Sequence, residues 1–222
     1  MDLNDRDRPA SISYLPKFKM KNKELKVILL GDSSVGKTSL LNKYIKNDFS
    51  LHYKATIGAD FLTKQLQREN SLINLQIWDT AGTERYHSIG TGFYRNCECC
   101  VLVCDLTNTE SFKSVEFWRK EFIKNANPQE GDKFPFVLFA NKSDMVSDIK
   151  ITEDEIKSFC SAHNDIPYFL VSAKEGNGVE EGFNKICDIA YKRVSDREDI
   201  VLPDVKPLHI QQLPEQKSKC PC

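Results

Sequence analysis

Short apolar runs and polar turns alternate along the middle of the chain, and this pattern predicts strands and helices in turn. Apolar runs typical of strands span 26–30, 60–67, 72–78, 99–104, 136–140 and 168–171. Segments suited to helices span 39–45, 83–94, 110–126 and 152–163, and a last helix would place Val179, Phe183, Ile186, Cys187 and Ala190 on one face. The turn-prone residues 69–71 lie between the second and third strands and indicate a hairpin.

This alternation predicts an α/β domain. Strand–helix–strand units build a mostly parallel sheet with helices on both faces, and the hairpin contributes the one antiparallel strand. We therefore expect a six-stranded sheet with about five helices, and a ligand at the carboxyl ends of the strands.

The two ends of the chain lack such periodicity. Residues 1–23 mix charges with prolines and are expected to form a flexible N-terminal extension, whereas residues 195–222 contain three prolines ahead of Cys220 and are expected to be disordered. The domain would thus span 24–194. A flexible tail of this length reaches roughly 25–30 Å, enough for the domain to stand off from whatever holds its end.

The composition of the chain limits the kinds of partner that it can bind. The net charge of −1 argues against nucleic acid, whose phosphates need a clear basic excess. No apolar stretch is long enough to span a bilayer and no signal-peptide core precedes the domain, so we expect the chain in the cytosol. Four cysteines crowd together at 97–104 as if to bind zinc, but they accompany an apolar run and are interpreted, like Cys160 and Cys187, as core residues.

The strongest chemical signal lies between the first strand and the first helix. Residues 31–38 read GDSSVGKT and fit G-x-x-x-x-G-K-[ST], the phosphate-cradling loop of P-loop nucleotidases. The fold class predicted is therefore the P-loop NTPase fold, the alternative being an incidental glycine turn. The side chain of Lys37 would reach the β- and γ-phosphates, and the Thr38 hydroxyl would bind Mg²⁺. The loop residues expected to bind nucleotide are Ser33, Ser34, Val35, Gly36, Lys37, Thr38 and Ser39.

Two further signals concern the metal and the γ-phosphate. The sequence Asp-Thr-Ala-Gly at 79–82 ends a strand, where the carboxylate of Asp79 can hold Mg²⁺ through its waters. Gly82 there would let a backbone N–H turn toward the γ-phosphate. Thr56, in a polar loop, offers its hydroxyl to Mg²⁺ and its backbone N–H to the γ-phosphate.

Two others concern the base. The sequence Asn-Lys-Ser-Asp at 141–144 ends a strand, and a carboxylate at Asp144 can accept hydrogen bonds from the N1–H and the N2 amino group of guanine, which adenine does not offer. A backbone N–H in the following Ser-Ala-Lys at 172–174 can meet the base oxygen. Each motif alone is also an ordinary polar turn, but their order along the chain predicts a guanine-nucleotide site. Its base-side residues are Asn141, Lys142, Asp144, Ser172, Ala173 and Lys174.

With these motifs the chain resembles the Ras-like small GTPases and, within them, the Rab family. The resemblance covers roughly residues 24–194 and the terminal cysteines, and the stretches 53–64 and 164–169 look most like the late-endosomal/lysosomal branch. It implies a GTPase whose switch segments, 53–61 and 80–93, are ordered by GTP. It also implies that Phe49 packs on guanine, that Tyr53 lies at the nucleotide, and that hydrolysis depends on Lys37, Thr56, Gly82 and Thr83.

The resemblance extends to partners. It implies that Phe61, Trp78 and Phe93 are read by effector proteins, although plain core packing would explain the same three residues. The ending Cys220-Pro-Cys222 resembles the site where Rab proteins receive two geranylgeranyl groups, which anchor a protein far better than one. An incidental pair of exposed cysteines is the alternative. The family also implies an exchange factor, a GTPase-activating protein, a prenyl escort and a GDP-dissociation inhibitor, acting on a monomer that divides between late-endosomal, lysosomal or other endomembranes and the cytosol.

One position departs from the family. Most Ras-like proteins carry a glutamine after residue 82 to orient the attacking water, whereas this chain has Thr83. Losing one such hydrogen bond costs roughly 1.5–3 kcal/mol, or about 10- to 100-fold in rate. Slow hydrolysis is therefore expected, although activating proteins of the family can supply a glutamine in trans. The alternatives are a scaffold that stays GTP-loaded and a P-loop kinase of small nucleotides, which the guanine motif disfavours.

Overall fold

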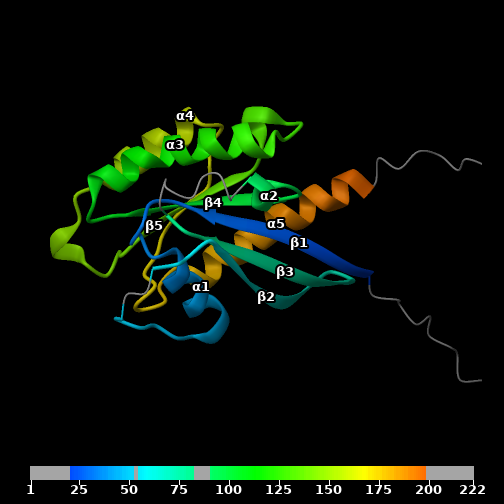
Figure 1. The fold of residues 1–222 in the computed structure, drawn as a ribbon, viewed down its shortest axis with the longest axis horizontal. Helices are drawn as coiled ribbons and strands as arrows, with labels where there is room; N and C mark the ends of the chain where they lie inside the picture. The colour runs from blue at the N-terminus through cyan, green and yellow to red at the C-terminus, as the bar shows by residue number, and fades with distance from the viewer. Residues whose placement is uncertain (1–20, 53–54, 83–90, 199–222) are drawn as a thin grey trace, which may run out of the picture.

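A computed structural model describes residues 21–52, 55–82 and 91–198 (Figure 1). Its strands are β1 (Lys21–Leu30), β2 (Ala59–Arg68), β3 (Ser71–Thr80), β4 (Cys99–Asp105), β5 (Phe136–Asn141) and β6 (Tyr168–Leu170). Its α-helices are α1 (Lys37–Lys46), α2 (Thr91–Tyr94), α3 (Thr109–Ala126), α4 (Glu153–Ala162) and α5 (Val179–Glu198), with short 3₁₀ turns at Gly131–Lys133 and Val146–Asp148.

The strands form one sheet in the order β2-β3-β1-β4-β5-β6. The hairpin strands β2 and β3 pair antiparallel, and every other neighbouring pair is parallel. Six strands and five α-helices in the described residues confirm the fold class expected from the sequence.

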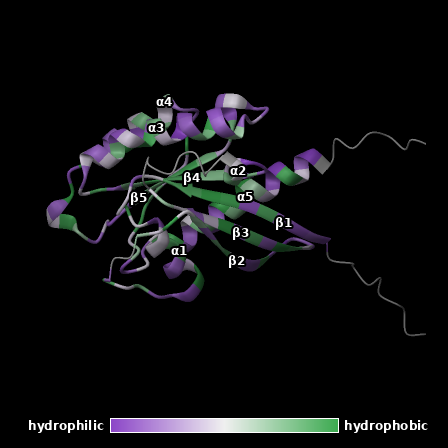
Figure 2. Cartoon of the chain, in the orientation of Figure 1, coloured by the Kyte–Doolittle hydropathy of each residue, from purple (hydrophilic) through white to green (hydrophobic). Residues whose placement is uncertain are grey.

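Side chains alternate between the two faces of the sheet and build a core on each. Leu25, Val27 and Leu29 of β1 face the cluster formed with α1 and α5, whereas Ile28 and Leu30 face the cluster formed with α3 and α4. Figure 1 shows α3 and α4 together above the sheet, and Figure 2 shows β4 and the later part of β1 in the hydrophobic colour, whereas β1 starts in the hydrophilic colour. Burial on both faces explains why the central strands lack an alternating polar pattern.

The crowded cysteines belong to this core. Cys97, Cys99, Cys100 and Cys104 are all buried, and their burial raises the pKa of Cys97 and of Cys104 to about 12. Thiols in such surroundings stay protonated and behave as small apolar side chains. Cys160 and Cys187 are buried as well, so the core interpretation of all six is confirmed.

Register brings the carboxyl ends of the strands to one edge. In the β1–β3 pair Leu29 lies beside Asp79, and in the β4–β5 pair Asp105 lies beside Asn141. The loop after β1 therefore starts next to Asp79, and the motif after β5 starts next to the end of β4. This edge is where a doubly wound sheet binds its ligand.

The ordered core extends a few residues beyond the expected boundaries at 24 and 194. β1 begins at Lys21, and α5 continues to Glu198. The reason is a contact between them: the Lys23 ammonium donates a hydrogen bond to the Ser195 hydroxyl at 3.0 Å and lies 4.9 Å from the centre of the Tyr191 ring. The start of β1 and the end of α5 hold each other in place. Among the described helices, none is both long and apolar enough to cross a membrane.

Candidate functional site

The loop that joins β1 to α1 is held in a conformation that suits an anion. Gly36 has φ of 96°, and a Cβ there would lie 2.3 Å from the Asn141 side-chain nitrogen, so no larger residue fits without a shift. α1 starts at the next residue and turns its unpaired N–H groups toward the loop. The loop residues 33–39 predicted to bind phosphate thus surround one helix N-terminus.

Lys37 lies folded across this loop. Its ammonium donates hydrogen bonds to the carbonyl oxygens of Gly31, at 2.6 Å, and Asp32, at 2.8 Å. Burial lowers the pKa of Lys37 to about 8, although the nearby charges of Asp79 and Asp32 oppose that shift. A buried ammonium held by neutral carbonyls is poised for a polyphosphate, which would supply the negative charge that stabilises it.

Three oxygen-bearing side chains predicted to hold the metal converge beside the loop. The Thr38 hydroxyl donates to Oδ2 of Asp79 at 2.5 Å and lies 2.8 Å from the Thr56 hydroxyl. Thr56 in turn lies 3.4 Å from the same carboxylate oxygen. β3 carries Asp79, α1 carries Thr38, and Thr56 precedes β2, so three separate segments meet here.

This oxygen cluster fits Mg²⁺. Burial raises the pKa of Asp79 above its ordinary value, while the hydrogen bond from Thr38 and the charge of Lys37 oppose the shift. The second carboxylate oxygen of Asp79 is buried and has no hydrogen-bond partner within the described residues. A hard cation with oxygen ligands is the group that such a carboxylate and two hydroxyls would hold.

Gly82 lies close against the backbone of the phosphate loop at Asp32 and Ser33. A Cβ on Gly82 would lie 2.4 Å from the Asp32 carbonyl carbon and 2.4 Å from the Ser33 nitrogen. The peptide after Asp32 is therefore in direct contact with the backbone of the second switch segment at Gly82. Thr83, where that segment continues, and Tyr53 lie outside the described residues.

Asn141 ties the base side of the site to the phosphate loop. Its side-chain nitrogen donates to the Val35 carbonyl at 2.8 Å, and its side-chain oxygen accepts from the Ala173 backbone N–H at 3.1 Å. One buried amide thus joins the loops after β1, β5 and β6. The sequence placed Asn141 in the site, and the structure shows it as the central link of three loops.

Asp144 is oriented by its neighbours. The Ser172 hydroxyl donates to one carboxylate oxygen of Asp144 at 2.7 Å, and the Lys174 ammonium lies 4.0 Å from the other. Lys142 has a left-handed φ of 66° and pairs with Asp105 at 2.6 Å. Phe49, which the resemblance places on the guanine, is half-buried and packs against the core cluster that includes α1.

The predicted effector residues form one aromatic stack. The rings of Phe61 and Trp78 lie 4.9 Å apart, and those of Trp78 and Phe93 lie 5.3 Å apart. Trp78 and Phe93 pack against the α3–α4 side of the core, whereas Phe61 is 47% exposed. Core packing therefore accounts for two of the three residues, and Phe61 presents the stack to solvent.

Two residues beside the site were missed by the sequence analysis. Asp105 directly follows the apolar run 99–104, as Asp79 follows the run 72–78, and that position was its available signal; the structure makes it the last residue of β4. Trp118 donates its indole N–H to the Asp32 carboxylate at 2.7 Å, across 86 positions of sequence. Trp118 lies at helical spacing from Val115 and Phe122, a pattern that indicates a core residue and gives no sign of this bond.

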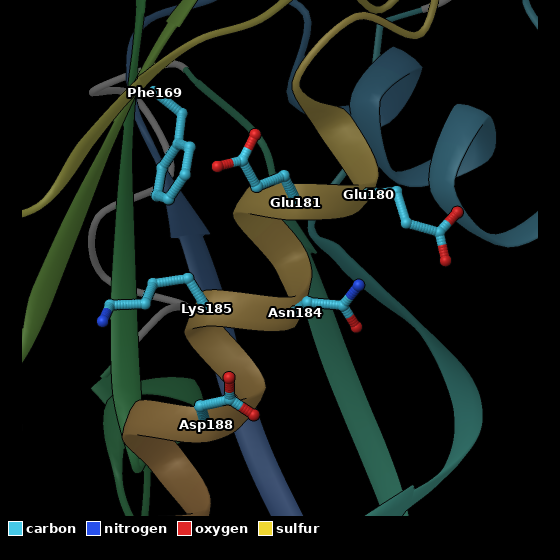
Figure 3. Close-up of a pocket in the computed structure, with 6 residues that line it drawn as sticks. All are labelled: Phe169, Glu180, Glu181, Asn184, Lys185 and Asp188. Atoms are coloured by element: carbon cyan, nitrogen blue, oxygen red, sulfur yellow. The ribbon is translucent and has the colours of Figure 1, made fainter.

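A shallow hollow elsewhere on the surface does not belong to this site. It lies between Phe169 of β6 and a row of polar side chains on α5, as Figure 3 shows. Two of these, Asn184 and Asp188, already accept hydrogen bonds from Arg68 of β2, at 2.9 and 2.7 Å. Its polar groups are thus partly engaged in holding the hairpin to α5.

Known proteins resemble the chain along most of its length. A model of the Ras family matches residues 26–192. A Ras-related protein Rab7A of Mesembryanthemum crystallinum is 48% identical over 204 residues, covering 91% of this chain and 98% of the relative. A Ras-related protein Rab7 of Pisum sativum is 51% identical, covering 81% and 88%. The Ypt/Rab-type GTPase ypt7 of Schizosaccharomyces pombe is 44% identical, covering 89% and 96%.

Proposed function

The chain belongs to the Rab family of Ras-like GTPases, and on that premise we propose that it is a GTP-hydrolysing switch of late-endocytic or vacuolar traffic. The observation that carries the proposal is the shared edge of the sheet. Lys37 at the start of α1, the oxygens around Asp79 near the end of β3, and the oriented Asp144 after β5 all lie at the carboxyl edge of the sheet. These are the groups needed for phosphate, metal and guanine.

The phosphate side acts by position and charge. Lys37 and the N–H groups at the start of α1 bind the β- and γ-phosphates, and the backbone N–H of Gly82 meets the γ-phosphate. Thr38, Thr56 and Asp79 would hold Mg²⁺, which when bound neutralises charge on the phosphates. In these roles the side chains bind and position the phosphates and form no covalent bond with them. The reaction rate therefore depends on how precisely the loops position these donors.

The base side sets specificity. The Asp144 carboxylate accepts the two donors of guanine, and the Ser172 hydroxyl holds that carboxylate in place. Adenine presents no such pair of donors, so it would leave the carboxylate unpaired. A site built around hydrogen bonds to one ligand rejects an analogue lacking them by about 10⁴-fold.

Slow hydrolysis is part of the proposal. Thr83 stands where most Ras-like proteins orient the attacking water with glutamine, so the GTP form would be long-lived until an activating protein binds. The same substitution supports a second candidate, a scaffold that stays GTP-loaded. The nucleotide bound after purification distinguishes the two: mainly GDP supports the switch, and mainly GTP supports the scaffold.

Membrane attachment and partners are proposed from the family. Cys220 and Cys222, outside the described residues, would carry two geranylgeranyl groups and place the chain on the cytosolic face of late-endosomal, lysosomal or vacuolar membranes. The tail from about residue 199 would act as the spacer, and residues 1–20 as a flexible extension. The chain would act as a monomer served by effectors, an exchange factor, an activating protein, a prenyl escort and a GDP-dissociation inhibitor. Localisation of the Cys220→Ser/Cys222→Ser double variant tests the anchor: an unchanged membrane pattern would contradict it.

A further inference from the structure

Trp118 reaches the phosphate loop from helix α3. The residue is almost fully buried in the cluster under α3, and its ring lies 5.5 Å from that of Phe117. Its indole N–H nevertheless leaves the apolar cluster and donates to the half-buried carboxylate of Asp32 at 2.7 Å. A hydrogen bond from a buried neutral donor to a carboxylate is of the stronger, charge-assisted kind.

Asp32 is connected to both reactive parts of the phosphate site. Its carbonyl oxygen accepts a hydrogen bond from the Lys37 ammonium at 2.8 Å. Its peptide is also the surface on which Gly82 rests, because a Cβ on Gly82 would come within 2.5 Å of the Asp32 carbonyl oxygen. The position of the Asp32 peptide thus determines where the Lys37 ammonium lies and where Gly82 of the second switch segment lies.

We propose that Trp118 is a positioning residue for GTP hydrolysis: its hydrogen bond to Asp32 fixes the peptide that orients Lys37 and supports Gly82. The inference rests on the proposed GTPase function and adds a residue of α3 to it. Trp118 acts through Asp32 and does not touch the nucleotide. Without the bond, the Asp32 carboxylate turns toward water and the peptide that it carries loses one of its fixed points.

Loss of the hydrogen bond between Trp118 and Asp32 should lower the rate of GTP hydrolysis more than the affinity for GDP. GDP keeps the phosphate-loop N–H groups, the metal oxygens and the Asp144 contacts, and only its contact with Lys37 depends on Asp32 and so on Trp118. The Gly82 N–H, by contrast, acts on the γ-phosphate, which GDP lacks. A misplacement of a fraction of an ångström at such a donor lowers a reaction rate strongly while changing ground-state affinity little.

The test uses the full chain and the Trp118→Phe variant, which keeps an aromatic ring and removes the N–H donor. We expect the single-turnover rate of GTP hydrolysis to fall by about tenfold, the order of one charge-assisted hydrogen bond's contribution. The rate of GDP release should stay within about twofold. Asp32→Ala should cause a similar fall, and the double variant no further one, because both changes remove the same bond.

A matched control separates positioning from packing. Val115→Ala also removes buried volume from the cluster under α3 but removes no hydrogen-bond donor, so its hydrolysis rate should equal that of the wild type. Equal hydrolysis by wild type and Trp118→Phe would overturn the inference, as would losses in the double variant that multiply. A wild type that binds no guanine nucleotide would instead overturn the proposed function, which keeps the two failures distinct.

Discussion

Asn141→Ala is the variant that probes the link between the base and phosphate loops most sharply. The side chain makes two buried hydrogen bonds, to the Val35 carbonyl at 2.8 Å and from the Ala173 N–H at 3.1 Å. Each such bond contributes about 1–1.5 kcal/mol net, so together they hold the three loops with about 2–3 kcal/mol. Because the nucleotide requires those loops in place, its affinity should fall by about 30- to 150-fold.

The assay is the dissociation constant of a fluorescent GDP analogue, measured with excess Mg²⁺. The control is Asn125→Ala, which removes a half-buried amide whose bonds stay within α3, to Glu121. The control should bind GDP with wild-type affinity. A change of less than about threefold in Asn141→Ala would refute the reasoning, since it would mean that nucleotide itself orders the loops without the amide.

The other predictions concern rate, charge and stability. Thr83→Gln should raise single-turnover hydrolysis about 10- to 100-fold, and equal rates would contradict the assigned role of the position. Chelation of Mg²⁺ should speed GDP release several-fold, and an unchanged rate would argue against the oxygen cluster as the metal site. The pKa of Lys37 is lowered to about 8 in the folded protein, so the unfolded chain binds more protons between pH 8 and about 10.5. The free energy of unfolding of the nucleotide-free wild type should therefore rise relative to that of Lys37→Met as pH rises through that window, by up to about 3 kcal/mol. A difference in urea unfolding that does not change with pH would contradict this. Arg193→Ala should cost about 2–4 kcal/mol in the same assay, because it leaves the buried Glu98 carboxylate with Arg197 alone and also removes the ion pair with Glu130 and the hydrogen bond to the Cys97 carbonyl; a loss below 1 kcal/mol would refute it.

The fold could be predicted from the sequence because each of its elements carries a local signal. Strand runs and helical spacing depend on nearest neighbours, and the hairpin turn is explicit in residues 69–71. The motifs at 31–38, 79–82 and 141–144 each follow a strand, so a parallel sheet had to bring them to one edge. That is why most of the predicted site residues lie together.

What the sequence could not predict depends on contacts between distant segments. Trp118 has the spacing of a core residue, and nothing local to α3 shows that its N–H meets Asp32. The outer ends of β1 and α5 likewise are ordered by contacts with each other, through Lys23 and Ser195. Taken alone, the composition of either end predicts a flexible segment, because neither end has a periodic apolar pattern. The contact that orders the two ends joins residues far apart in the sequence and leaves no local signal.

The central claim is a guanine-specific nucleotide site at the carboxyl edge of the sheet. Calorimetric titration of the nucleotide-free full chain with GDP and with ADP, both with Mg²⁺, tests it most directly. The account predicts binding of GDP about 10⁴-fold tighter than that of ADP, because Asp144 finds both its donors on guanine alone. Equal affinities, or tighter binding of ADP, would contradict it.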